Sequence, residues 1–248
     1  MIKQYGKVMV LMKKEQYLGV DVSPLNYEEI IDDIRQRIEA GKQSTIIAVN
    51  PEKVMAANNN SDLKNLINDS TYQIPDGVGI ILASKLKKGN IRSRVTGVDM
   101  MERLIRFAAE EDRKVFLYGA KEEVVVKAKK NLEEKYQGLN IVGYENGYVQ
   151  DQEALLKKIN DSEAELLFVA MGSPKQELWI QENKPKLAVK VFQGVGGSFD
   201  VFAGKVQRAP KVYRQLGLEW FYRLIKEPKR LKRQMALPKF LIKILLTK

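Results

Sequence analysis

The sequence predicts an α/β fold with a mainly parallel sheet, helices on both faces of the sheet, and a basic helical segment at the C-terminus. Short apolar runs alternate with longer segments of helical periodicity, which is typical of parallel strands joined by crossover helices. The apolar fraction of 44% in 248 residues is enough for a sizeable core. The whole net charge of +11 lies near the C-terminus, which distinguishes that segment from the rest of the chain.

The elements follow an irregular leader at residues 1–14. The expected strands are 17–22, 45–49, 70–74, 115–118, 140–144, 166–170 and 189–193. The expected helices are 27–40, 51–59, 79–86, 99–111, 121–136, 153–160 and 174–183. Asn26 with Glu29 fits a capping box, and Asn50 before Pro51 fits an N-cap with proline in the first helical position. We therefore expect a Rossmann-like domain over residues 1–203.

Residues 204–248, called the C-terminal segment below, form a basic appendage. Residues 205–248 contain 13 Lys or Arg and only two acidic residues. Their apolar residues are interleaved with the basic ones in pieces too short to cross a bilayer, but such helices can lie in a membrane interface. The charge predicts an anionic partner for this segment, either a membrane surface or a polyanion. Because the apolar residues favour lipid, we expect a cytoplasmic protein that is peripheral on the inner face of the cell membrane. Without a membrane, an exposed apolar tail favours self-association into homo-oligomers.

The composition also limits the chemistry. The chain has no cysteine and no histidine, so it lacks thiolates, disulfides and the commonest general base and metal ligand. Acid–base catalysis must use Asp, Glu, Lys or Tyr. No Asp-x-Asp pair occurs, although many enzymes of nucleotide sugars hold a divalent metal with one. We expect no metal and no cofactor, and a diphosphate would need Arg, Lys or helix N-termini instead.

Asp76 is the candidate general base. Ligands of open α/β sheets bind beyond the carboxyl ends of the strands, and Asp76 directly follows an expected strand. Gly77 and Gly79 would let a ligand approach the backbone closely. An Asp-Gly pair is equally typical of a plain turn, but the absence of histidine adds weight to the catalytic interpretation.

Other strand–helix junctions offer binding groups. Asn50 either caps a helix or contacts a ligand, and the residues alone favour the cap. Gly119 could seat a diphosphate on a helix N-terminus, and Gly196 with Gly197 either cradles phosphate or forms a tight turn. Lys175 lies at an expected helix N-terminus, where a cation is unfavourable unless an anion binds.

Arginines provide further candidates for binding an anion. Arg92 and Arg94 precede a loop that leads into an expected helix; they either meet an anionic substrate or form a solvated pair. In the C-terminal segment, Arg223, Arg230 and Arg233 are spaced to lie near one helical face. That face either binds an anion or is a solvated or lipid-facing strip.

The order of these motifs resembles the WecG/TagA/CpsF family of glycosyltransferases. The resemblance covers residues from about 17 to the C-terminus. It is carried by Asn50-Pro51-Glu52, Pro75-Asp76-Gly77, Arg94-Val95-Thr96-Gly97, Gly172-Ser173-Pro174-Lys175-Gln176-Glu177, Gly194-Val195-Gly196-Gly197-Ser198-Phe199-Asp200, and Gly217-Leu218-Glu219-Trp220 followed by Tyr222-Arg223-Leu224.

The resemblance implies a reaction. Members transfer N-acetylmannosamine, its uronic acid or related hexoses from UDP to undecaprenyl-diphosphate-linked sugars, with inversion and without an obligatory metal. We therefore expect a UDP-sugar donor, a polyprenyl-diphosphate-linked acceptor and a cell-surface polymer such as wall teichoic acid as the product. N-acetylmannosamine is the expected sugar, and another hexose or a uronic acid is the alternative. Ala48 stands where teichoic-acid members have threonine, which puts one donor contact in question.

The resemblance also implies residue roles. Asp76 would deprotonate the acceptor hydroxyl. Asn50, Arg94 and Gln176 would line the sugar-nucleotide pocket. A mobile C-terminal segment would close over the site and contact diphosphate through Arg223, Arg230 and Arg233.

Two other functions compete with this one. A basic C-terminal segment can bind nucleic acid, but its large apolar complement favours lipid, so we expect no nucleic-acid partner. An α/β domain can also bind a nicotinamide cofactor, and the missing G-x-G-x-x-G fingerprint argues against that.

Overall fold

A parallel sheet of six strands forms the centre of the protein. We obtained a computed structural model that describes residues 13–210, 212–213, 217–226, 231 and 235–247, except for the side chain of Arg223. The strands pair in the order β4-β3-β8-β7-β5-β6, and every pairing is parallel. They span Ser44–Val49 (β3), Tyr72–Pro75 (β4), Lys114–Gly119 (β5), Asn140–Glu145 (β6), Leu166–Ala170 (β7) and Val191–Gly194 (β8). The expected α/β, Rossmann-like fold is confirmed.

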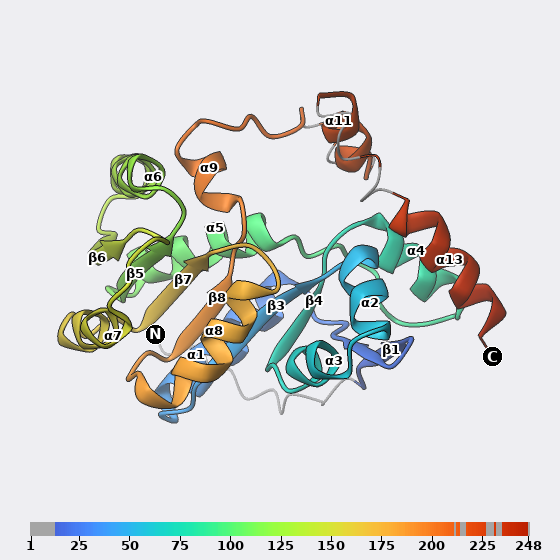
Figure 1. Ribbon diagram of the computed structural model, residues 1–248, viewed down its shortest axis with the longest axis horizontal. Coiled ribbons are helices and arrows are strands. Elements are labelled where there is room, and N and C mark those ends of the chain that lie inside the picture. The colour runs from blue at the N-terminus through green and yellow to red at the C-terminus, as the bar shows by residue number, and fades with distance from the viewer. Residues whose placement is uncertain (1–12, 211, 214–216, 227–230, 232–234, 248) are drawn as a thin grey trace, which may run out of the picture.

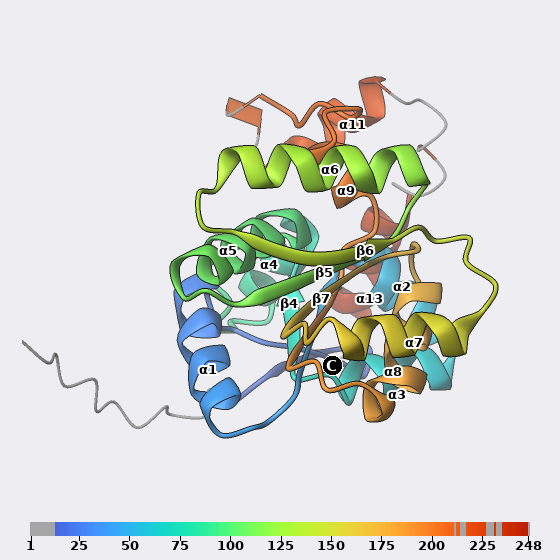
Figure 2. The ribbon, with the colours of Figure 1, turned by 90° about the vertical axis from the view of Figure 1, so that its left-hand side faces the viewer.

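Helices cover both faces of the sheet, as Figures 1 and 2 show. On one face a core cluster joins the sheet to α1 (Tyr27–Glu39), α5 (Gly97–Glu110), α6 (Glu122–Lys135) and α9 (Ser198–Phe202). On the other face lie α2 (Pro51–Asn58), α3 (Ser61–Asn68), α7 (Gln152–Asp161) and α8 (Lys175–Asn183), which the short 3-10 turn Lys184–Lys186 follows. Strands β3, β5, β7 and β8 contribute buried apolar side chains to both faces, as is typical of strands inside a parallel sheet.

One local expectation was wrong, and one helix was missed. The segment 17–22 is not one strand but a hairpin of β1 (Glu15–Tyr17) and β2 (Val20–Val22). The chain reverses between them because Leu18 and Gly19 have positive φ values of 52° and 80°, which glycine favours. Helix α3 was not predicted, although Asn60 caps it by accepting a hydrogen bond from the Leu63 N–H.

The C-terminal segment continues from α9 over the carboxyl edge of the sheet (Figure 1). It includes α11 (Glu219–Lys226) and α13 (Ala236–Leu246), and α13 packs against α2 and α4 (Val78–Leu86). Phe240 and Ile244 of α13 are buried in the same cluster as Tyr17 of β1. The boundary at residue 203 stays a prediction, and most of the expected leader lies outside the described residues. Among the described residues, no helix is long and apolar enough to cross a membrane.

Candidate functional site

The main candidate site is a cavity of about 520 Å³ at the carboxyl edge of the sheet. Its wall comes from the loops after β3, β4, β7 and β8, from the N-terminus of α5, and from α11 and α13. In an open α/β sheet this edge is where ligands bind. The C-terminal segment contributes Trp220 and Leu237 to the wall, so the cavity lies between the α/β domain and that segment.

Asp76 is held at this edge by the sheet itself. Its N–H donates to the Val49 carbonyl at 2.8 Å and so continues the pairing of β4 with β3. Gly77, with a φ of 99°, then turns the chain into α4. One carboxylate oxygen, Oδ2, accepts a hydrogen bond from the Gly97 N–H at 3.1 Å. Gly97 is the first residue of α5, and the N-terminal end of a helix favours a negative charge.

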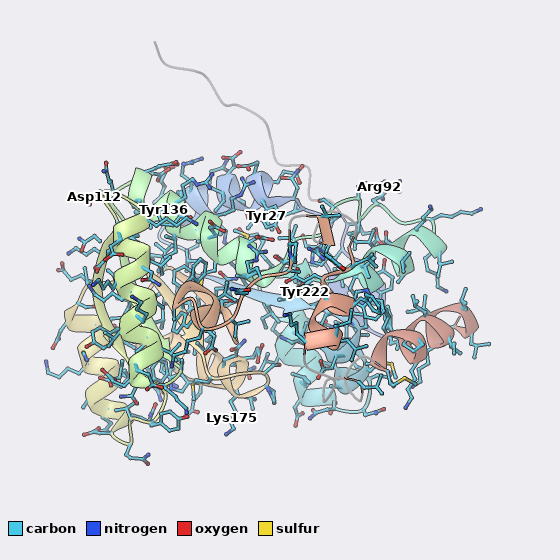
Figure 3. The ribbon with its side chains drawn as sticks, turned by 90° about the horizontal axis from the view of Figure 1, so that it is seen from above. Tyr27, Arg92, Asp112, Tyr136, Lys175 and Tyr222 are labelled. Atoms are coloured by element: carbon cyan, nitrogen blue, oxygen red, sulfur yellow. The ribbon has the colours of Figure 1, made fainter. Side chains whose placement is uncertain are left out.

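Tyr27 fixes the N-terminus of α5 next to Asp76. Its hydroxyl oxygen accepts a hydrogen bond from the Thr96 N–H at 2.8 Å, and Thr96 caps α5 through the Asp99 N–H at 3.2 Å. Burial, together with the negative charges of Asp99 and Asp76, raises the pKa of Tyr27. The phenol therefore stays neutral and holds Thr96, the residue before the Gly97 whose N–H donates to Asp76; Tyr27 is labelled in Figure 3.

Asn50 performs the capping role that the residues alone favoured. Its Oδ1 accepts a hydrogen bond from the Lys53 N–H at 2.8 Å at the start of α2. The same residue also lies on the cavity wall. The two roles are compatible, because the capping hydrogen bond holds the Asn50 side chain in one orientation at the cavity wall.

Gln176 connects two walls of the cavity. It is only 4% exposed, and its Oε1 accepts a hydrogen bond from the Gly196 N–H at 2.9 Å. Its Nε2 donates to Oε1 of Glu177 at 3.1 Å. Gly194 leaves room for this amide, because a Cβ there would lie 2.5 Å from Gln176 Nε2. Helix α8 itself begins without a side-chain cap.

Arg94 links the α/β domain to α11. Its Nη2 lies 3.3 Å from Oε2 of Glu219, and both side chains are largely buried. Nearby, Arg208 forms an ion pair with Asp99 of α5 at 2.6 Å. These two contacts attach the C-terminal segment to the domain on the side of Asp76. Arg92, in contrast, is exposed at the outer edge (Figure 3).

Comparison with known proteins agrees with this geometry. Residues 15–248 match the Glycosyl transferase WecG/TagA/CpsF family. The chain belongs to this family. It is also similar to N-acetylglucosaminyldiphosphoundecaprenol N-acetyl-beta-D-mannosaminyltransferase of Bacillus subtilis (strain 168), with 37% identity over 235 residues that cover 94% of this chain and 92% of the relative. The resemblance seen in the motifs is confirmed, and the protein is a glycosyltransferase.

The structure gathers most of the predicted site residues of this glycosyltransferase in one place. The cavity is lined by Asn50, Asp76, Arg94, Gln176, Gly196 and Gly197. Two predicted binding residues lie elsewhere. Gly119 packs against β7, where a Cβ would lie 2.4 Å from the Ala170 carbonyl oxygen. Lys175 is exposed at the edge of the molecule (Figure 3). Their ligand roles stay predictions, as do those of Arg223, Arg230 and Arg233, which fall outside the described side chains.

Lys53 and Glu177 are site residues that the sequence did not single out. Lys53 lines the cavity from the first turn of α2, and its ammonium lies 2.7 Å from Oε1 of Glu177. The signal that could have identified Lys53 was its position, because a cation near a helix N-terminus is unfavourable without a nearby anion. The same reasoning was applied to Lys175, which lies outside the cavity wall.

Proposed function

We propose that this glycosyltransferase moves N-acetylmannosamine from UDP to N-acetylglucosamine on undecaprenyl diphosphate, with inversion at the anomeric carbon. The printed activity of the B. subtilis relative supports the sugar and the acceptor. The observation that supports the mechanism is the position of Asp76, an acid at the carboxyl edge of the sheet on the wall of the cavity described above. Another UDP-hexose or a uronic acid remains the alternative donor, because Ala48 also lines the cavity.

The reaction is a single displacement. The acceptor hydroxyl oxygen attacks the anomeric carbon while Asp76 takes its proton, and the bond from that carbon to the diphosphate breaks. The electron pair of this bond leaves with UDP. The hydrogen bond from Gly97 and the N-terminus of α5 favour the ionised carboxylate that a general base requires.

In this proposal, cationic side chains and backbone N–H groups of the protein stabilise the negative charge on the departing diphosphate. Arg94 and the Gly196–Gly197 loop lie on the cavity wall, and the arginines of the C-terminal segment complete the site in this proposal. Preorganised donors of this kind stabilise a developing anion. A metal-independent reaction is supported by the chain's lack of histidine and Asp-x-Asp. Within the described residues, no group of three or more acidic side chains is arranged to hold a metal ion.

The proposed reaction takes place on the inner face of the cell membrane, where the lipid-linked acceptor resides. The outer surface of α13 exposes Ile242, Leu245 and Leu246, and the adjacent α4 exposes Leu82 and Leu86. Exposed lysines accompany them on both helices and the loop after α4: Lys85, Lys87, Lys88, Lys239 and Lys243. An apolar surface surrounded by lysines suits an anionic lipid interface.

The decisive test of the chemistry is Asp76→Asn. General-base catalysis contributes about 10²–10⁴-fold, so transfer from UDP-N-acetylmannosamine to a short-chain lipid-diphosphate acceptor should fall by that factor. Because asparagine keeps an oxygen for the Gly97 N–H, UDP binding measured by calorimetry should change little. Turnover within threefold of wild type would refute the assignment of Asp76. A panel of UDP-sugars in the same assay identifies the donor.

A binding assay separates the membrane from the rival partners. We expect co-sedimentation with vesicles that contain phosphatidylglycerol, and loss of that binding together with transfer activity when residues 204–248 are deleted. Tighter binding to duplex DNA than to vesicles across a salt series would favour the nucleic-acid function instead. Binding of NAD rather than UDP would favour the oxidoreductase.

A further inference from the structure

A buried ion pair beneath the cavity wall has no role in the proposed reaction so far. The Lys53 ammonium and Glu177 carboxylate lie 2.7 Å apart, and their side chains are 10% and 1% exposed. Removing two charges from water is costly, and apolar residues of similar volume often give equal or better stability. Stability alone therefore does not account for a buried pair at this position.

The surroundings of Glu177 show that the pair does more than join two helices. Its Oε1 accepts hydrogen bonds from both the Lys53 ammonium and the Gln176 amide. Gln176 in turn holds the Gly196 N–H. One carboxylate thus orders a lysine from α2 and, through Gln176, the glycine-rich loop after β8. Both the lysine and that loop lie on the cavity wall.

Lys53 retains capacity to bind a ligand. An ammonium group has three N–H donors, and Glu177 is its one hydrogen-bond partner among the described residues. Lys53 lies on the cavity wall, which also carries Arg94 and the Gly196 loop. The N-terminal residues of α2, Asn50 and Pro51, also lie on this wall, and the N-terminus of a helix favours a negative charge. The ligand group that such a set of donors suits best is a phosphate.

We infer that Lys53 is a phosphate-binding residue of the donor pocket, and that Glu177 positions its ammonium group for the diphosphate of the UDP-sugar. Glu177 offsets the cost of burying a lysine, and so keeps the ammonium in place before the donor binds. This inference rests on the proposed function, because it assumes that the cavity binds a nucleotide sugar.

The test measures UDP and uridine binding to the full-length protein by calorimetry. Lys53→Met removes the ammonium and retains much of the apolar stem. Loss of one charge-assisted hydrogen bond should weaken UDP binding by about 10- to 100-fold, and uridine binding should change by less than threefold. Lys127→Met, on the exposed surface of α6, is the matched control and should bind UDP like the wild type.

A double variant separates ligand binding from a purely structural pair. Lys53→Met alone leaves Glu177 buried without its cation, so weaker binding could come from a disturbed fold. Lys53→Met/Glu177→Gln removes both charges together, a change that proteins often tolerate. We expect the double variant to bind UDP as weakly as Lys53→Met, with circular dichroism and thermal unfolding close to wild type. Glu182→Gln, exposed on the same helix as Glu177, controls for the loss of a carboxylate.

Three results would overturn the inference. Unchanged UDP affinity in Lys53→Met would show that the ammonium does not contact the donor diphosphate, even if the KM of the lipid acceptor rises. Recovery of UDP affinity in the double variant would show that the pair is structural. Weaker binding in the double variant than in Lys53→Met would show that Glu177 acts by another route. Failure of the wild type to bind UDP would instead refute the proposed function.

Discussion

Phe240→Ala should release α13 from the α/β domain. Phe240 is fully buried, and its ring lies 6.2 Å from that of Tyr17 at an interplanar angle of 72°. It belongs to a cluster that includes Val54 of α2 and Ile80 of α4. Truncation of a buried phenylalanine typically costs about 3–5 kcal/mol.

That cost is comparable to the whole docking energy of the helix. On α13, Phe240 and Ile244 are the buried side chains among the described residues, and burial of each contributes about 1.5–3 kcal/mol. The loss of Phe240 therefore removes about half or more of the apolar contribution. We expect α13 to undock locally while the sheet stays folded, because helices at the edge of a domain can open without global unfolding.

Hydrogen exchange measured by mass spectrometry checks this expectation. Amides of residues 236–246 in Phe240→Ala should exchange about 100-fold faster or more, as a loss of about 3 kcal/mol in protection implies. Ile242→Ala, on the exposed side of the same helix, should leave exchange unchanged. Equal exchange in Phe240→Ala and wild type, or equal acceleration in both variants, would refute the packing of α13 on the domain.

Two further predictions concern stability. Burial opposes ionisation of Glu102, but hydrogen bonds from Lys135 and Tyr136 outweigh it and lower the pKa of Glu102 below 4.5. A carboxyl with a lowered pKa stabilises the fold above about pH 4.5, and this contribution is lost as the pH falls. Glu102→Gln should therefore lower the free energy of unfolding, measured in urea, by about 1 kcal/mol at pH 7 and by much less at pH 3. An equal loss at both pH values would contradict this role of Glu102. Gly119→Ala should cost about 2–4 kcal/mol in thermal unfolding, because the φ of 115° is unfavourable for alanine and the new Cβ would overlap the Ala170 carbonyl. Gly41 also has a positive φ, but a Cβ there would meet open space, so Gly41→Ala should lower the stability by only about 1 kcal/mol. Similar losses of stability in the two variants would contradict the packing role of Gly119.

Most strands and helices could be predicted from the sequence because their signals are local. The capping box of Asn26 and Glu29 and the cap of Asn50 are both present. The turn at Leu18 and Gly19 was missed because an apolar run of this length fits one strand as well as two short ones. Asp76 could also be named in advance, since an acid after a strand reaches the ligand edge in any parallel sheet.

The sequence by itself determined the fold class, the family motifs and the place of the net charge, because periodicity, motif order and local composition can be read along the chain without knowing which distant segments touch. Only the tertiary structure decided which junctions meet. Strand order brings β3, β4 and β8 together and leaves Gly119 on β5 at a distance from the cavity wall. The tertiary structure also brings Lys53 into contact with Glu177, which lies 124 positions later in the sequence. Such contacts depend on the packing of distant segments, for which the local sequence has no signal.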